Sequence, residues 1–285
     1  MRAAPKLYSV FVNGIEMTDY AKDYTADELM VCRLSRELND DSIMLNGTVS
    51  FIPVAAAMLA RLTHAPGLTW VAGAVGVDAQ PGSILGNTLD PTMWKDCVMY
   101  LPQLEDMWSY VHRNTLEVFC IRGAQIDKYG NVNNSVIGNF RKPKVRLPGS
   151  AGMGDMCTLD KHILIWSTTH NVRTFVERVD FLAAPGYFDG SDKREKLGLK
   201  NGPKLVVTDL CVMDFEPKSK RMRLQSVHHG VTPKQVQERT GFELIVPDQV
   251  PVTEAPTNEQ LRLLREVVDP KAMRKIEFRG SETKV

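Results

Sequence analysis

The sequence lacks the short motifs that assign many enzymes to a class. Its five cysteines lie far apart and form no C-x-x-C pair, which argues against a disulfide framework or a zinc knuckle. It contains no H-E-x-x-H pattern, Walker loop, nucleophile elbow or G-x-G-x-x-G. The adjacent His228 and His229 would face opposite ways from a strand, so a surface or packing role is expected for each. We therefore expect no metal site and no cofactor.

Long apolar runs and an excess of one charge are missing as well. The most apolar stretches, residues 54–62 and 68–77, are shorter than the roughly 20 residues that a membrane span needs. The N-terminus is basic, but no apolar segment follows it as in a signal peptide. Lys plus Arg number 35 and Asp plus Glu number 34, and the resulting charge of +1 gives no general attraction for nucleic acid or an acidic membrane. A cytoplasmic protein that binds neither is expected.

The order of the expected elements favours one fold class. Residues 1–24 are interpreted as an N-terminal arm and 25–285 as one α/β domain, whose first helix begins at Thr25 with Glu28 completing a capping box. Strands and helices then alternate, which predicts parallel βαβ units in an open, mostly parallel sheet with flanking helices. The expected strands are 42–45, 68–72, 97–101, 116–121, 163–166 and 204–207; the expected helices are 25–38, 53–62, 105–113, 232–240 and 257–268.

Residues 122–160 are dense in glycine, asparagine and proline, and they are too long for a simple connection. The glycines of residues 149–155 would let backbone N–H groups approach an anion or a carbonyl oxygen, although a plain turn fits equally well. Asn131 and Asn133 alternate along an extended segment. Their amides would either hold a ligand or satisfy the backbone of the loop, and the second role is favoured.

A series of motifs in fixed order, over roughly residues 25–270, resembles a known family. The motifs are Gly47-Thr48, Ala65-Pro66, the segment 123–133, Pro143 with Gly149-Ser150, Pro185-Gly186, Asp189-Gly190, Val206-Val207-Thr208-Asp209 and Thr240-Gly241-Phe242. They are similar to the β subunits of family I coenzyme A transferases of the glutaconate CoA-transferase type. The resemblance implies a NagB/RpiA-like α/β fold and a related α subunit as partner, in an α2β2 heterotetramer.

One departure from that family bears on the reaction. In the transferases a β-subunit glutamate attacks the thioester just after the strand that follows Ala-Pro, and the corresponding position here is Gly73. No glutamate occurs anywhere between Asp41 and Leu104. Because glycine carries no nucleophile, a covalent acyl-glutamate cycle at this position is chemically excluded.

Two further stretches, 226–233 and 264–271, are similar to the β subunits of bacterial hydrolases that open steroid rings in cholesterol degradation. That likeness implies retro-Claisen hydrolysis of a C–C bond in a cyclic keto or enone acyl-CoA, with coenzyme A as part of the substrate. The catalytic residue would be a glutamate of the α subunit, acting on water as general base. An acyl-CoA decarboxylase, whose relatives carry a cysteine at this position, a CoA-transferase subunit and a non-catalytic structural subunit are the alternatives.

The expected contribution of this chain is a cleft rather than a nucleophile. Ser150 and the N–H groups around Gly149–Gly152 would stabilise a developing oxyanion. Asn131 and Asn133 would position loops or ligand, and Gly73 would leave room for substrate or water. The predicted cleft residues are Gly73, Asn131, Asn133, Gly149, Ser150 and Gly152.

Overall fold

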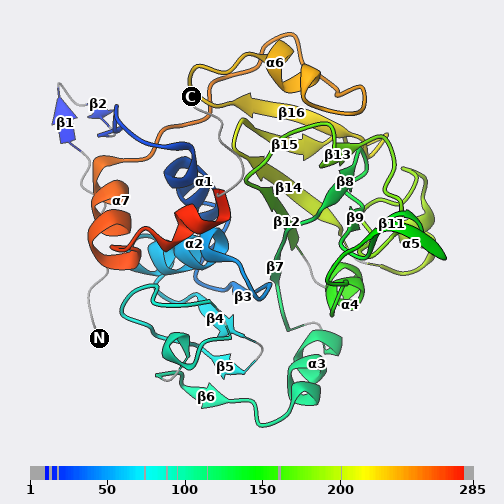
Figure 1. The fold of residues 1–285 in the computed structure, drawn as a ribbon. Helices are drawn as coiled ribbons and strands as arrows, with labels where there is room; N and C mark the ends of the chain where they lie inside the picture. The colour runs from blue at the N-terminus through cyan, green and yellow to red at the C-terminus, as the bar shows by residue number, and fades with distance from the viewer. Residues whose placement is uncertain are drawn as a thin grey trace. The chain divides into compact units, whose positions relative to one another are not determined.

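The computed structural model describes residues 10–12, 15–17 and 19–278, except residues 74, 88, 95, 114, 160, 161 and 200. The chain divides into two compact units (Figure 1). Unit 1 comprises the described part of 1–107 and 254–282, and unit 2 that of 108–253. The boundary falls within α3 (Leu104–His112). The predicted separation of residues 1–24 from a domain that starts at residue 25 stays a prediction.

Unit 1 contains the βαβ arrangement that the alternating pattern predicts. β3 (Ile43–Asn46) and β4 (Thr69–Ala72) are parallel neighbours joined by α2 (Phe51–Leu62). β5 (Gly76–Val77) and β6 (Met99–Tyr100) extend this sheet with antiparallel pairing. The segment between them includes the short helix η1 (Pro91–Met93), and β1 (Val10–Val12) and β2 (Ile15–Met17) form a separate hairpin.

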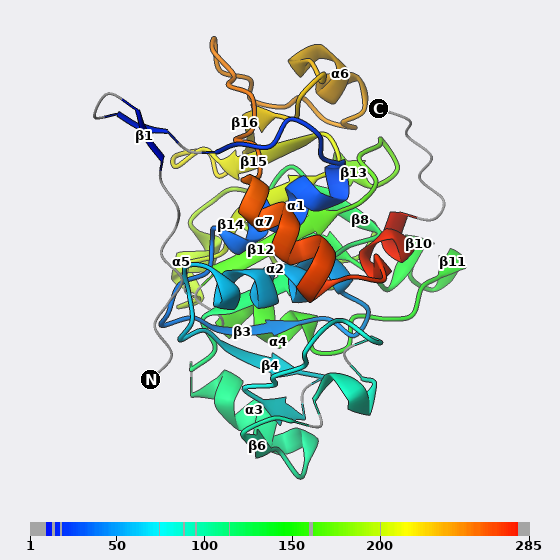
Figure 2. The same ribbon diagram turned by 90° about the vertical axis from the view of Figure 1, so that its left-hand side faces the viewer.

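The helices of unit 1 come from both ends of the chain. α1 (Ala26–Ser35) begins where predicted, and the N–H of Thr25 donates to the Glu28 carboxylate at 3.0 Å. α2 packs against α1, α7 (Asn258–Leu263), its π-helical continuation η2 (Leu264–Val268) and η3 (Met273–Phe278), as Figure 2 shows. The helix predicted over 257–268 is therefore an α-helix up to Leu263 and a π-helix from Leu264. The carbonyl oxygen of Leu264 accepts a hydrogen bond from the N–H of Asp269, five residues on.

A buried cluster of charges joins these two ends. The Arg274 guanidinium, 3% exposed, donates to Asp27 at 2.7 Å, Asp269 at 2.9 Å and Glu28 at 3.1 Å. Burial would raise the pKa of Glu28, but hydrogen bonds from Arg265 and from the Thr25 N–H, together with the charges of both arginines, lower it to about 2. The start of α1 and the C-terminal segment are thereby held together by ion pairs between buried carboxylates and arginines.

The main-sheet strands that belong to unit 2 follow the order β16–β15–β14–β12–β7. β7 (Val118–Ile121), β12 (His162–Ser167) and β14 (Pro203–Thr208) are parallel, and β15 (Cys211–Phe215) and β16 (Met222–Val227) are antiparallel. α4 (Met153–Leu159) packs on β7 and α6 (Pro233–Glu238) on β16, while α5 (Lys193–Lys196) is a single short turn. With the parallel pair of unit 1, this sheet confirms the predicted α/β class.

The predicted turn system of residues 122–160 is built from short strands. β8 (Gln125–Asp127) pairs with β9 (Val132–Asn133) and with β13 (Phe175–Val176). β10 (Val136–Asn139) and β11 (Lys142–Arg146) form a two-stranded hairpin. No helix in the described part of the chain is long and apolar enough to cross a membrane.

Candidate active site

Gly73 lies in unit 1, immediately after β4 and at the start of the turn into β5. Its φ of +57° is a left-handed conformation that favours glycine. Asp78 is the nearest acidic residue along the chain, but its carboxylate accepts from Arg61 at 3.0 Å and from Gln80 at 3.1 Å. The end of β4, which the resemblance predicts to match the position of the transferase glutamate, therefore has no side chain at Gly73 and no free carboxylate at Asp78.

Asn131, in unit 2, is buried and its amide is fully hydrogen bonded. Nδ2 donates to both carboxylate oxygens of Asp127, at 3.0 and 2.9 Å, and to the carbonyl oxygen of Phe188 at 2.6 Å. Oδ1 accepts from the N–H groups of Gly186 at 2.9 Å and Phe188 at 3.1 Å. The side chain thus fastens the β8–β9 turn to the loop at 186–188, and it is placed to position that loop.

Asn133 has a similar internal role. Its Nδ2 donates to Gln125 Oε1 and to the carbonyl oxygen of Val136, both at 2.7 Å, and its Oδ1 accepts from the Ser135 N–H at 2.9 Å. The residue is fully buried. The geometry of both asparagines therefore matches the loop-supporting role that the sequence favours.

The loop at 149–152 differs, because it keeps donors available. Gly149 has φ +111° and its N–H donates to the carbonyl oxygen of Asn134 at 2.9 Å. Within the described residues, the N–H groups of Ser150, Ala151 and Gly152 and the Ser150 hydroxyl form no hydrogen bond. These groups precede α4, and they are free to meet a carbonyl oxygen or an oxyanion.

Two close contacts fix this loop. A Cβ on Gly152 would lie 2.1 Å from Cη2 of Trp108, so the glycine is needed where the backbone passes the indole. Asn134 accepts from the Ala124 N–H and donates to the Arg122 carbonyl oxygen, both at 2.8 Å. Asn134 therefore joins the carboxyl end of β7 to Gly149. No motif in the sequence marks Asn134 as a site residue, although it adjoins Asn133 in the same asparagine-rich segment.

A buried polar network occupies the carboxyl ends of the other strands of unit 2. The ring nitrogens of His170 lie 3.0 Å from the hydroxyls of Thr208 and Thr240, and its backbone N–H donates to Asp209 at 2.8 Å. His228 lies 3.0 Å from the Thr253 hydroxyl and 2.8 Å from the carbonyl oxygen of Thr208. The motifs 206–209 and 240–242 were the sequence signal for this network, which the predicted cleft did not include.

The pKa values in this network follow from burial. Burial lowers the pKa of His170 to about 3, with smaller effects of the charges of Arg239 and His228. Burial also lowers the pKa of His228 to about 4, against the effect of its bond to Thr208. Burial raises the pKa of Asp209 to about 6, although the His170 N–H opposes this shift. At neutral pH both histidines are therefore uncharged.

We expect acid to destabilise the native chain through these histidines. A histidine with a lowered native pKa gains its proton more easily when unfolded, so its stabilising effect is complete above about pH 6.5 and is lost as the pH falls toward 4. Asp209 acts in the opposite direction between about pH 6 and 4. His228→Gln should remove about 1–2 kcal/mol of the decline in unfolding free energy between pH 7 and 5, as measured by urea titration.

The neighbouring residue provides the control for this prediction. His229 is exposed, so His229→Gln should keep the wild-type dependence of stability on pH. Equal slopes for the wild type and His228→Gln would contradict the assignment of the acid sensitivity to the buried ring.

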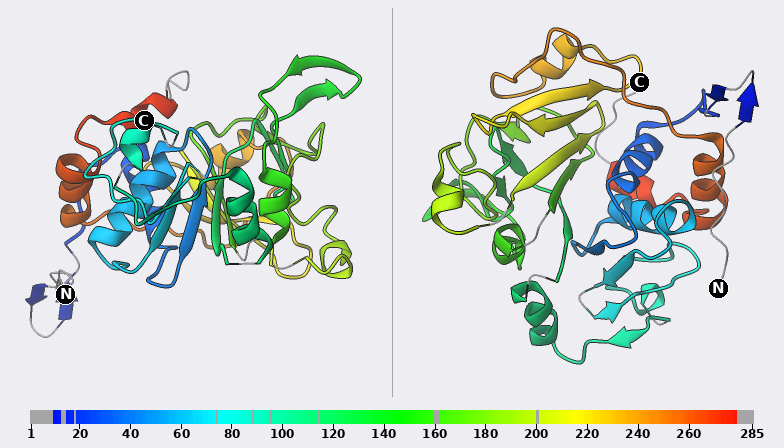
Figure 3. Two further views of the ribbon diagram at one scale, coloured as in Figure 1. Left: turned by 90° about the horizontal axis from the view of Figure 1, so that it is seen from below. Right: turned by 180° about the vertical axis from the view of Figure 1, so that it is seen from behind.

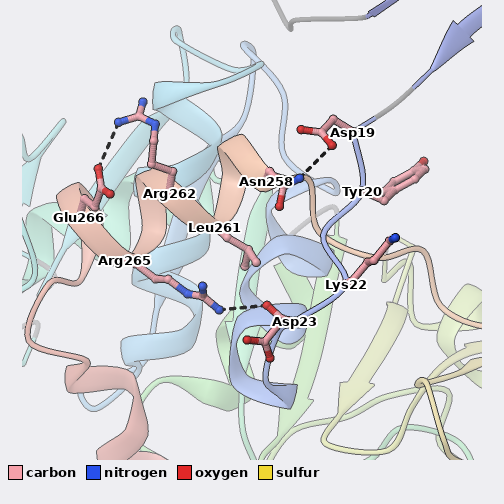
Figure 4. Close-up of a pocket in the computed structure, with 9 residues that line it drawn as sticks. All are labelled: Asp19, Tyr20, Lys22, Asp23, Asn258, Leu261, Arg262, Arg265 and Glu266. Carbon is pink, nitrogen blue, oxygen red and sulfur yellow. Dashed lines mark hydrogen bonds and ion pairs between the residues drawn. The ribbon is translucent and has the colours of Figure 1, made fainter.

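A separate pocket of about 560 Å³ lies in unit 1, between residues 19–23 and the C-terminal helix (Figure 4). Its charged side chains mostly bond to protein groups: Arg262 pairs with Glu266, Arg265 donates to the Asp23 carbonyl oxygen and to Glu28, and Asp19 accepts from Asn258. None of the residues predicted for the cleft lines it. We therefore do not identify it with the candidate site.

The chain matches a known protein family over most of its length. The family model for coenzyme A transferase covers residues 28–239, a span that includes β3, β4, the loop at 149–152 and much of the buried network. The chain belongs to the coenzyme A transferase family. The resemblance expected from the motifs is therefore confirmed.

Members of this family that are similar to the chain differ in the reactions their names give. One subunit of the 3-oxoadipate CoA-transferase of Pseudomonas knackmussii is 34% identical, over 85% of this chain and 92% of the relative. One subunit of the glutaconate CoA-transferase of Acidaminococcus fermentans is 32% identical, over 89% and 96%. A chain of the crystal structure of that enzyme matches with a TM-score of 0.79, over 90% and 98%.

A hydrolase subunit is comparably similar. The cholesterol ring-cleaving hydrolase IpdB subunit of Rhodococcus jostii is 32% identical, over 78% of this chain and 84% of the relative. A chain of the crystal structure of IpdAB from that organism matches with a TM-score of 0.76 at 25% identity, over 90% and 99%. Similarity alone thus fixes the family and leaves the reaction to be argued from the site.

Proposed function

We propose that this chain is the β subunit of a heteromeric CoA-thioester hydrolase that opens a ring by hydrolytic C–C cleavage of a cyclic keto or enone acyl-CoA, in the degradation of a steroid ring. The observation that carries the proposal is Gly73, which stands where a transferase would place its attacking glutamate. The salt bridge between Asp78 and Arg61 adds to it, because the next carboxylate along the chain is already paired. The similarity to the IpdB subunit supports the same choice.

The reaction would proceed without a covalent enzyme intermediate. A glutamate of the α subunit accepts a proton from water, and the resulting hydroxide adds to the ring ketone. The bond between that carbon and the carbon next to the thioester then breaks, leaving a carboxylic acid. Its electron pair passes into the thioester as an enolate, which takes up a proton at carbon. The product equals the substrate plus one water, and CoA stays attached.

This chain would contribute donors to the enolate oxygen. The unbonded N–H groups of Ser150, Ala151 and Gly152 and the Ser150 hydroxyl are the candidates. Their loop is held by Trp108 and Asn134, so little rearrangement is needed when charge develops on the oxygen. Asn131 and Asn133 would not contact the substrate in this scheme, and their role would be to fix the loops of unit 2.

The test is mass analysis of the product formed by this chain together with its α subunit. With a cyclic β-keto acyl-CoA we expect the mass of one water to be gained and CoA to be retained. Acyl transfer to added acetate, or release of carbon dioxide, would instead assign a transferase or a decarboxylase. Ser150→Ala should lower kcat about tenfold or more, and Ser191→Ala, on an exposed turn, serves as control. Full activity of Ser150→Ala and of loop variants at Gly152 would favour a structural subunit.

A further inference from the structure

The hairpin of β10 and β11 carries four positive charges within six residues. They are Arg141, Lys142, Lys144 and Arg146. All four side chains are exposed, and none forms an ion pair with a carboxylate among the residues that the structure describes. Because the whole chain has a net charge of only +1, this is a local excess that attracts anions.

The base of this hairpin is fixed, while its strands stand out from the rest of unit 2, as the left view of Figure 3 shows in green. Gly138, with φ +86°, donates its N–H to the Asp180 carboxylate at 2.8 Å, and Gln125 donates to the same oxygen at 3.1 Å. The Asp180 carboxylate thus accepts from two neutral donors at the base, and within the described residues it forms no ion pair with the cations of β11.

An aromatic platform accompanies the charges. Phe140, at the hairpin turn, is 51% exposed, and its ring stacks on Phe181 with centroids 5.1 Å apart. The guanidinium carbon of Arg146 lies 5.2 Å from the centre of the Phe140 ring. An exposed ring beside several cations is suited to a nucleotide, since the base stacks on the ring while the phosphates meet the charges.

We propose that this hairpin binds the nucleotide end of coenzyme A, its adenine and its phosphate groups. The inference rests on the proposed function in one respect, that the substrate carries CoA. β11 leads directly into the loop at 149–152, which would hold the thioester. In an extended chain, at about 3.3 Å per residue, the eight residues from Lys142 to Ser150 span at most about 26 Å. A pantetheine arm with bonds of about 1.5 Å spans roughly 15 Å, which is within this limit.

The experiment is a titration of CoA into the complex of this chain with its α subunit, followed by calorimetry. The double variant Lys142→Ser/Lys144→Ser should raise the Kd for CoA about tenfold or more, because charge-assisted bonds to phosphate are lost. Phe140→Leu should raise it about threefold by removing the stacking ring. The control Lys196→Ser/Lys234→Ser removes the same charge at two highly exposed positions and should leave the Kd within about twofold.

Pantetheine, which lacks the adenine and the phosphates, distinguishes the hairpin from the thioester site. It should bind the wild type and the hairpin double variant equally. Unchanged CoA binding by that variant, or equal loss of pantetheine binding, would overturn the inference. Failure of the variant to assemble with the α subunit would do so too, and would indicate a protein contact instead. A complex that binds CoA through the hairpin but opens no ring would leave the inference standing and refute the proposed function.

Discussion

Replacing Arg274 with methionine is expected to lower the free energy of unfolding by about 3–5 kcal/mol. Methionine keeps most of the apolar stem but removes the cation that pairs with three buried carboxylates, those of Asp27, Glu28 and Asp269. Among the residues that the structure describes, Arg265 is then the one cation still paired with this cluster, through Glu28. Uncompensated buried charge is more costly than the pair was worth, so the loss should exceed that of any one hydrogen bond. Chemical denaturation at pH 7 measures the effect.

Arg262 is the matched control on the same C-terminal segment. It bridges Glu259 and Glu266, but half of its side chain is exposed. Because solvent screens such pairs, Arg262→Met should cost at most about 1 kcal/mol. Similar losses for the two variants would contradict the distinction between the buried cluster and the surface pair.

The Arg274 cluster also has a consequence for the candidate site. Arg274 lies near the start of the helix η3. Glu277, in the same helix, accepts hydrogen bonds from the N–H groups of Phe51 and Ile52 at 3.0 and 3.2 Å. Phe51 and Ile52 are the first residues of α2, and β4 and then Gly73 follow α2 along the chain. Loss of the cluster should therefore disturb the turn at Gly73 as well as lower stability.

The elements of this fold that the sequence predicts well are those with local signals. The capping pair at Thr25 and Glu28 correctly places the start of α1, and the apolar run before Ala72 correctly places β4. Both depend on residues close together in the chain, so periodicity and capping rules are sufficient. The strand expected over residues 97–101 is shorter in the structure, because only Met99 and Tyr100 pair with β5.

Features that depend on residues far apart in the chain are harder to predict from the sequence. The Arg274 cluster joins residues almost 250 positions apart, and His170 meets Thr240 at a separation of 70. No local pattern announces such contacts, because the packing of the sheet and its helices brings these residues together. The sequence favours a loop-supporting role for the amides of Asn131 and Asn133, but their partners, which include Gly186 and Gln125, are found only in the structure.

Gly186→Ala is expected to be the most disruptive single-methyl change in the loops that Asn131 supports. The added Cβ would lie 2.4 Å from the carbonyl carbon and oxygen of Gly130 and from the carbonyl oxygen of Tyr129, all of which are backbone atoms. No side-chain rotation relieves such a contact, so the loop must move away and lose the hydrogen bond from its N–H to Asn131. We expect a loss of about 3 kcal/mol or more in unfolding free energy.

Gly154→Ala provides the matched control in the same unit. Its Cβ would meet no atom closer than the Ala183 carbonyl oxygen at 3.5 Å, an ordinary contact, and the residue lies in α4, where alanine is the better helix former. Stability should be unchanged or rise slightly. A double-mutant cycle that combines Gly186→Ala with Asn131→Ala tests whether the methyl group acts by breaking the hydrogen bond between these residues. Two changes that break the same hydrogen bond should cost less together than the sum of their separate effects. Strict additivity of the two free-energy changes would mean that the methyl group displaces the backbone without breaking the hydrogen bond from Gly186 to Asn131.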